Sequence, residues 1–216
     1  MQLVLDWDGT VTERDSLWML LDRYGDPEVF ARVEGALVAG RLSFREVMEI
    51  EFATVTAPLD EVCDFLVQEV RIRPGFAELA RKHRPLILSS GFHELIEPLL
   101  AREAIQLELI ANRLDPRGEG WRVLWRDPEP CAVCGDLCKR RALPDGPVAY
   151  GGDGYSDRCA ALFADRVFAR DGLAAWLDEN GVAYEPFADL ADVARALEGA
   201  PAGGAVVPRT RMTGRK

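Results

Sequence analysis

Two carboxylates stand two residues apart at the end of the first hydrophobic run. The chain opens with MQLVLDWDGT, in which Asp6 and Asp8 follow four mostly apolar residues and lead into Gly9 and Thr10. Residues i and i+2 of a strand point to the same side, so these two acidic side chains would repel each other. A protein keeps like charges together mainly where a cation or a developing positive charge lies between them. The alternative is a solvated turn, since Asp and Gly are ordinary turn residues.

Other polar residues end later hydrophobic runs. Ser89 and Ser90 close the run RPLILSSG, and Asp153 and Asp157 follow the run GPVAYGG, with Lys139 a short distance ahead of it. Ligands of open α/β sheets bind outside the carboxyl ends of the strands, so we expect these side chains to gather at one sheet edge. Carboxylates in such a setting favour Mg²⁺, which binds one or two of them together with waters and a substrate phosphate.

This combination of residues suits phosphoryl transfer. One aspartate can attack phosphorus and form an aspartyl-phosphate, which splits one hard hydrolysis into two easier steps. The second aspartate can protonate the leaving oxygen and later activate water. A lysine and a hydroxyl would neutralise and position the phosphoryl oxygens. The sequence therefore predicts a Mg²⁺-dependent hydrolase of a small phosphomonoester.

The elements that must position these residues alternate between strand and helix from Arg73 onward, which predicts a parallel α/β sheet. Buried strands are expected at QLVLD, RPLILSSG, LELIAN, GPVAYGGDG and DRVFARD, and a hairpin at RLDPRGEGWRVLWRD. Four segments with helical periodicity fill residues 16–71, between the first two strands. We predict an α/β fold with a Rossmann-like parallel sheet core, a small helical cap inserted after strand 1 and a β-hairpin after strand 3.

The domain prediction follows from this pattern. Residues 1–12 and 74–200 would form the core, residues 13–73 the helical cap, and the Pro/Gly-rich residues 201–216 a disordered tail. The formal net charge is −10 and no basic face is visible before the tail, which argues against a nucleic-acid partner. No apolar run approaches the roughly 18 residues of a membrane span, which argues against a membrane partner.

Composition also predicts a compartment. The N-terminus lacks the basic region and cleavage site of a signal peptide, and the five cysteines are an odd number in a chain large enough not to need disulfides. A cytoplasmic protein is therefore expected. Its expected partner, which follows from the predicted hydrolase activity, is a small phosphorylated metabolite. The sequence leaves the oligomeric state open.

Four segments resemble, in order, the motifs of the haloacid dehalogenase superfamily of phosphatases. They are DWDGT, LILSSG, CKRRAL and GGDGYSD, and they span almost the whole chain. The resemblance implies that Asp6 is the nucleophile and Asp8 the general acid/base. It implies a Mg²⁺ site formed by Asp6, the backbone carbonyl of Asp8 and Asp153, with Asp157 in support. The substrate-binding positions expected from the same motifs are Thr10, Asp15, Ser89, Ser90, Gly91 and Lys139.

The predicted cap limits which class of substrate the enzyme would accept. An insertion from Glu13 to about Arg73 resembles the phosphoserine-phosphatase branch of the superfamily. Where that branch carries a glutamate for the substrate amine, this chain has Asp15. Where it carries an arginine for the substrate carboxylate, Glu49 or Glu51 stands in this chain, which disfavours phosphoserine, although Arg45 could still reach the site.

Two further segments indicate particular groups of phosphatases within that branch. CAVCGDLCK and DRVFARDGLAAWLDENGVAYEPFADL together resemble the methionine-salvage phosphatases, which act on a phosphorylated methylthio-diketone or enol, and this is our leading interpretation. CAVCGDLCK also resembles the phosphoethanolamine and phosphocholine phosphatases, whose cationic head group would suit acidic cap residues. A non-catalytic protein that binds a ligand or a partner is the alternative from a different class.

Three cysteines form a cluster in the sequence. Cys131, Cys134 and Cys138 could be thiolate ligands of zinc or of an iron–sulfur centre. A fourth ligand is not evident nearby, because Cys63 and Cys159 lie in helical patterns. The favoured interpretation is that these thiols pack or shape the loop, since cysteine often behaves as a small buried hydrophobe.

Overall fold

The computed structural model describes residues 1–199, so the predicted tail at 201–216 lies outside the described residues. The strands are β1 (Gln2–Leu5), β2 (Leu86–Phe92), β3 (Leu109–Asp115), β4 (Arg122–Leu124), β5 (Val148–Gly152), β6 (Arg166–Ala169) and β7 (Glu185–Pro186). The α-helices are α1 (Ser16–Tyr24), α2 (Pro27–Val38), α3 (Phe44–Phe52), α4 (Leu59–Glu69), α5 (Phe76–His83), α6 (His93–Arg102), α7 (Arg158–Ala161), α8 (Asp171–Glu179) and α9 (Leu190–Glu198). Two short 3₁₀ helices, η1 (Lys139–Ala142) and η2 (Tyr155–Asp157), lie near the site described below.

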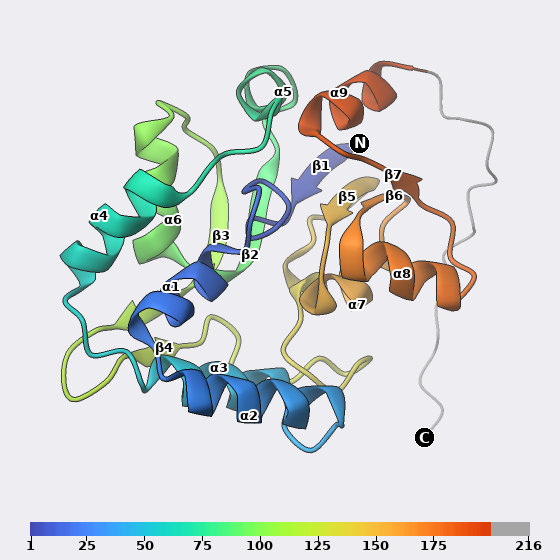
Figure 1. The fold of residues 1–216 in the computed structure, drawn as a ribbon. Coiled ribbons are helices and arrows are strands. Elements are labelled where there is room, and N and C mark those ends of the chain that lie inside the picture. Colours follow the sequence, from blue (N-terminus) through green and yellow to red (C-terminus); the bar gives the residue numbers. More distant parts are fainter. Residues whose placement is uncertain (200–216) are drawn as a thin grey trace.

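The strands form one sheet in the order β4-β3-β2-β1-β5-β6-β7 (Figure 1). Neighbouring strands are parallel except β4, which pairs antiparallel with β3 and places Leu124 opposite Arg113. The predicted parallel core and the hairpin after the third strand are therefore confirmed. The two-residue strand β7 was not predicted, because it is too short to show a period of its own.

Both faces of the sheet are covered, which explains why its central strands read as continuous apolar runs. Leu3 and Leu5 of β1 point into one core cluster, and Val4 between them points into another. The first cluster includes buried residues of α5, α6 and α9, and the second those of α7 and α8. Figure 1 shows α7 and α8 on the opposite side of the sheet from α6.

The helices between β1 and β2 begin at the capping signals in the sequence. The Asp26 side chain accepts hydrogen bonds from the first turn of α2, and Pro27 occupies the first position of that helix. Ser43 and Glu46 form a reciprocal capping box at the start of α3. The four predicted helices in this stretch are therefore present as α1 to α4.

The two ends of this helical insertion are joined at one point. Thr12 and Ile72 form an antiparallel bridge, and the backbone N–H of Arg73 donates to the carbonyl of Val11 at 2.8 Å. The insertion thus leaves and re-enters the sheet beside the residues that follow β1. Among the helices of residues 1–199, none combines the length and apolar character needed to cross a bilayer.

Candidate active site

The turn after β1 carries the first two predicted aspartates. Asp6 is buried, and its Oδ1 accepts a hydrogen bond from the backbone N–H of Trp7 at 2.5 Å. Gly9 has a φ of +71°, and a Cβ atom there would collide with the carboxylate of Asp153. Glycine is therefore required at this position both for its backbone conformation and for the close approach of the Asp153 side chain.

The turns after β1 and β5 meet, as the sequence predicts. The hydroxyl of Thr10 donates to Asp153 Oδ1 at 2.9 Å. Asp6, Asp153 and Asp157 each offer a carboxylate oxygen, and these atoms all lie within 4.8 Å of one another. Acidic groups far apart in the sequence thus gather at one sheet edge.

Lys139 lies within this acidic cluster. Its Nζ is 2.5 Å from Asp6 Oδ1 and 2.7 Å from Asp157 Oδ1, and the residue is only 2% exposed. Burial by itself would lower the pKa of this ammonium group, but the charges of Asp157 and Asp6 raise it above its usual value. Lys139 therefore stays positively charged.

Both carboxylate oxygens of Asp157 accept hydrogen bonds. Its Oδ1 also accepts from the Tyr150 hydroxyl at 2.6 Å, and its Oδ2 accepts from the backbone N–H groups of Asp153 and Gly154 at 3.0 and 2.9 Å. Burial opposes its ionisation, yet Lys139 and these donors keep the pKa of Asp157 below its usual value. With both oxygens occupied, Asp157 is suited to holding the turn that carries Asp153.

Asp8 has a different environment. Its Oδ1 accepts hydrogen bonds from the backbone N–H of Ser16, at 3.0 Å, and from the Ser16 hydroxyl. Burial, followed by the charge of Asp15, raises the pKa of Asp8 to about 7 in spite of these donors. A carboxyl group with a pKa near neutral pH can both donate and accept a proton.

The end of β2 supplies the predicted serines. Ser89 is buried, and its Oγ accepts from the backbone N–H of Gly91 at 2.8 Å. The carbonyl of Ser90 accepts from the Asn112 side chain at 2.8 Å, which ties β2 to β3 next to the site. Ser89 and Ser90 thus lie in the second half of β2, just beyond the point where β2 stops pairing with β1.

A cavity of about 270 Å³ opens between the sheet edge and the helices α1 to α3. The predicted site residues among those that line it are Asp6, Asp8, Asp15, Ser89, Ser90, Gly91, Lys139 and Asp153. Thr10 and Asp157 are fully buried and are not among the lining residues. The structure thus brings all the predicted site residues together, two of them behind the cavity wall.

The helical wall of the cavity distinguishes the two glutamates that the sequence left open. Glu51 of α3 lines the cavity, whereas Glu49 pairs with Arg45 at 2.9 Å and accepts from the Trp125 side chain at 2.7 Å. Burial, then the charges of Glu34 and Asp15, raises the pKa of Glu51 to about 7. A carboxyl group with a pKa near neutral pH therefore faces the cavity.

Sequence reasoning did not identify Arg73. Its buried guanidinium donates to the backbone carbonyls of Gly9 at 2.7 Å, Thr10 at 2.8 Å and Thr12 at 2.9 Å. These bonds hold the turn that carries Asp6 and Asp8. An arginine some 60 residues from that turn gives no local signal of this role, and the fold alone reveals it. Sequence reasoning also did not identify Ser16, which donates to Asp8, or Tyr150, which donates to Asp157.

The charge balance of the cavity fits a divalent cation. Among the lining residues of the described chain, Lys139 is the only basic one, and it stands against several carboxylates. Burial, then repulsion by Asp157, raises the pKa of Asp153 to about 7, and the same two effects raise the pKa of Asp6. Oxygen donors that share excess negative charge are the ligands that Mg²⁺ prefers. Asp6 and Asp153 are thus suited to Mg²⁺.

Comparison with known proteins agrees with this site. The family described as haloacid dehalogenase-like hydrolase matches residues 3–162. The chain therefore belongs to the haloacid dehalogenase-like hydrolases.

Two sequence relatives carry a more specific name. The 2-hydroxy-3-keto-5-methylthiopentenyl-1-phosphate phosphatase of Geobacillus kaustophilus is 34% identical over 212 residues, which cover 91% of this chain and 96% of the relative. The phosphatase of the same name from Exiguobacterium sibiricum is 29% identical, over 92% of this chain and 96% of the relative. Within its family the chain is therefore a phosphatase that hydrolyses phosphate monoesters.

Solved structures share the fold. Phosphoserine phosphatase from T. onnurineus aligns with a TM-score of 0.64 at 16% identity, over 92% of this chain and 94% of that one. A phosphoserine phosphohydrolase-like protein from Francisella tularensis aligns with a TM-score of 0.62 at 20% identity, over 91% of this chain and 99% of that one.

Proposed function

We propose that this phosphatase depends on Mg²⁺ and works through an aspartyl-phosphate on Asp6. The main support is the contact of Asp6 with Lys139, together with carboxylate oxygens of Asp6 and Asp153 close enough to share one cation. Asp6, Asp153 and the carbonyl of Asp8 would hold Mg²⁺, which when bound supplies positive charge that offsets the carboxylates and the phosphoryl oxygens.

The reaction has two displacement steps. A carboxylate oxygen of Asp6 attacks phosphorus, a new O–P bond forms, and the ester P–O bond breaks while Asp8 donates a proton to the leaving oxygen. Asp8 then takes a proton from water, which attacks phosphorus, releases phosphate and regenerates Asp6. Lys139 and Ser89 hold the phosphoryl oxygens through both steps. A pKa near 7 suits Asp8 to both of its tasks.

Residues 13–73 act as a cap over this centre. Helices α1 to α3 contribute much of the cavity wall, so that a bound substrate lies between them and the sheet edge. A covering of this kind excludes water other than the one that reacts. The remaining described residues, 1–12 and 74–199, form the core that carries the reacting groups.

The substrate we propose is a phosphate ester with a methylthio chain, like the one in the names of the sequence relatives. The cavity has an apolar part that suits such a chain, lined by Leu17, Trp18, Leu21, Phe30, Leu37, Phe44, Val47 and Met48. Glu51 can hydrogen-bond to a hydroxyl or keto group, because a carboxyl group with a pKa of about 7 can both donate and accept. An acidic residue here also disfavours the carboxylate of phosphoserine.

The acidic residues support a second candidate. Asp15, Glu34 and Glu51 line the same cavity, and a substrate with an ammonium group, such as phosphoethanolamine, would find opposite charges there. Either substrate is a small phosphorylated metabolite. None of the five cysteines forms a disulfide, which supports a reducing compartment such as the cytoplasm.

A substrate panel distinguishes these candidates. The kcat/KM values would be compared for 2-hydroxy-3-keto-5-methylthiopentenyl-1-phosphate, phosphoethanolamine, phosphocholine and phosphoserine, with Mg²⁺ and with Asp6→Asn as the inactive control. We expect the methylthio compound to have the highest value. A higher value for phosphoethanolamine would favour the second candidate, and a higher value for phosphoserine would reject both.

A further inference from the structure

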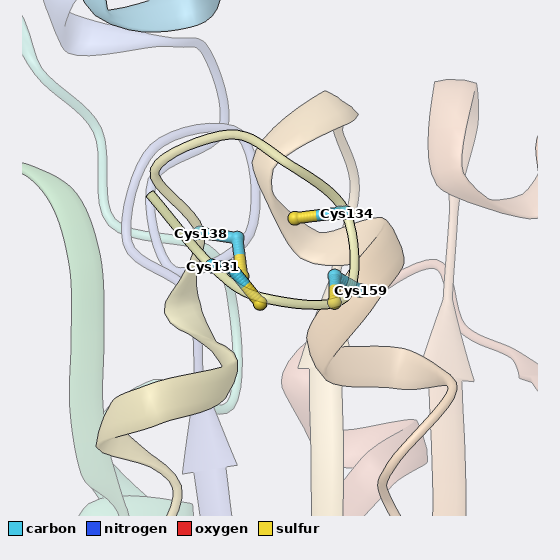
Figure 2. Close-up of side chains that lie close together, drawn as sticks. All are labelled: Cys131, Cys134, Cys138 and Cys159. Atoms are coloured by element: carbon cyan, nitrogen blue, oxygen red, sulfur yellow. The ribbon is translucent and has the colours of Figure 1, made fainter. Parts of the chain in front are cut away.

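Four cysteines converge beside the catalytic cavity. Cys131, Cys134 and Cys138 lie in the loop between β4 and η1, and Cys159 lies on α7. Figure 2 shows the four side chains gathered where this loop runs alongside the helix that carries Cys159. Their Sγ atoms all lie within 4.8 Å of one another, and none of them forms a disulfide. Cys159 is thus the fourth thiol that the sequence pattern lacked.

The spacing of the sulfur atoms suits one tetrahedral metal ion. Zinc binds cysteine sulfur at about 2.3 Å, so the four sulfurs of a tetrahedral site are about 3.8 Å apart. The limit of 4.8 Å between the cysteine sulfurs is close to this value, so small side-chain rotations would complete the geometry. Two of the ligands, Cys131 and Cys159, are buried.

The backbone around Cys131 is folded for a thiolate. The N–H of Val133 points at Cys131 Sγ, 3.4 Å away, and the N–H of Gly135 donates to the Cys131 carbonyl at 2.9 Å. Gly135 closes this turn with a φ of +75°, a conformation that favours glycine. Nη1 of Arg140 lies 3.8 Å from the same sulfur. These donors would offset the excess negative charge of four thiolates around one dication.

We propose that Cys131, Cys134, Cys138 and Cys159 bind one structural Zn²⁺ ion. Four sulfur donors are typical of zinc and of iron–sulfur centres, whereas Mg²⁺ requires oxygen donors. Sulfur atoms within 4.8 Å of one another suit a single ion better than a cluster, which favours zinc. The site is therefore distinct in its chemistry from the carboxylate cluster at Asp6. Each cysteine that binds as a thiolate releases its proton to solvent when Zn²⁺ enters. A site with four protein ligands is closed and does not take part in catalysis directly.

The position of the proposed zinc site suits it to holding Lys139 in place. Cys138 directly precedes Lys139, and Cys159 follows Asp157 by two residues. A metal ion bound to both cysteines would tie η1 to α7 and so fix the Lys139–Asp157 ion pair, which measures 2.7 Å. The zinc ion would thus position the lysine that we assign to the phosphoryl group. The metal content tests the site whether or not the proposed substrate is correct.

The test measures metal on the intact protein. Chain purified without an affinity tag would be analysed by mass spectrometry for its metals and by X-ray absorption at the zinc edge. We expect about one zinc per chain with four sulfur neighbours at about 2.3 Å. The Cys131→Ser/Cys134→Ser double variant should lose this zinc. Cys63→Ser is the matched control, since Cys63 is a half-buried thiol on α4 whose Sγ donates to the Glu94 carbonyl.

A second measurement does not depend on the folding of a variant. Wild-type protein stripped of metal under reducing conditions would be titrated with Co²⁺, and its melting temperature followed with Zn²⁺ or Mg²⁺. We expect the visible bands of tetrahedral Co²⁺ with thiolate-to-metal charge transfer, and a melting temperature that rises with Zn²⁺ more than with Mg²⁺. Reduced protein that purifies without zinc and gives no such bands would overturn the proposal. Iron in place of zinc would overturn the choice of metal.

Discussion

Glu51 provides a sharp test of the electrostatics of the cavity. It is only 6% exposed, and burial together with Glu34 and Asp15 raises its pKa from the ordinary 4.5 to about 7. A carboxyl group whose pKa is raised in the fold favours the folded state at low pH and costs stability as the pH rises through the folded pKa. The Glu51→Gln variant, whose amide carries no charge, should therefore become more stable than the wild type as the pH rises from about 4.5 to about 7.

The magnitude follows from the size of the shift. At 1.36 kcal/mol per unit, the difference between about 7 and 4.5 corresponds to an upper limit of about 3 kcal/mol. The carboxyl group faces a cavity open to water, so we reduce this to about 1–2 kcal/mol. The gain should be complete above pH about 7 and absent below pH about 4.5.

Urea unfolding at a series of pH values, with a chelator present to remove divalent ions, measures this difference. Glu49→Gln is the matched control, because Glu49 lies on the same helix but is exposed and paired with Arg45. It should show no gain in stability at high pH. A Glu51→Gln variant that is less stable than the wild type at pH about 8, or whose difference does not change with pH, would refute the reasoning.

Two further predictions concern the turn after β1. Arg73→Ala removes a buried guanidinium that donates to three backbone carbonyls. It should lower the free energy of unfolding, measured by urea titration, by about 3 kcal/mol. Arg71→Ala, at an exposed position, is the control and should change the free energy of unfolding by less than about 0.5 kcal/mol. Equal effects of the two would contradict the role given to Arg73. Asp8→Asn should slow steady-state hydrolysis of an alkyl phosphate by at least about 100-fold. With p-nitrophenyl phosphate, whose leaving group needs no proton, stopped-flow absorbance should still show a burst of product, and its absence would argue against Asp8 as the acid.

The helices and strands could be predicted where the residues at their ends and their hydrophobic pattern indicate the same element. The helices α2 and α3 begin at Asp26 and Ser43, whose capping signals are visible in the sequence. The central strands are apolar throughout because both of their faces are covered, and the turn residues at their ends point to a shared edge. The gathering of the candidate site residues at one sheet edge could therefore be predicted from a single sequence.

The remaining parts depend on contacts between distant segments. Arg73 gives no pattern of its own, and the pairing of the chain around Thr12 with the chain around Ile72 brings it to the turn after β1. Cys159 reads as one apolar position of a helix, because its partners lie more than 20 residues away in an irregular loop. Whether Glu49 or Glu51 faces the cavity depends on the rotation of α3 about its axis. Sequence spacing does not determine that rotation relative to the sheet.

The nucleophile can be identified directly. Wild-type protein would be mixed with substrate and Mg²⁺, quenched in acid within the first turnover and digested, and the phosphorylated peptide located by mass spectrometry. Our account predicts an acid-stable, base-labile phosphoryl group on Asp6, and none in Asp6→Asn. A phosphoryl group on any other side chain, or turnover by Asp6→Asn at the wild-type rate, would contradict it.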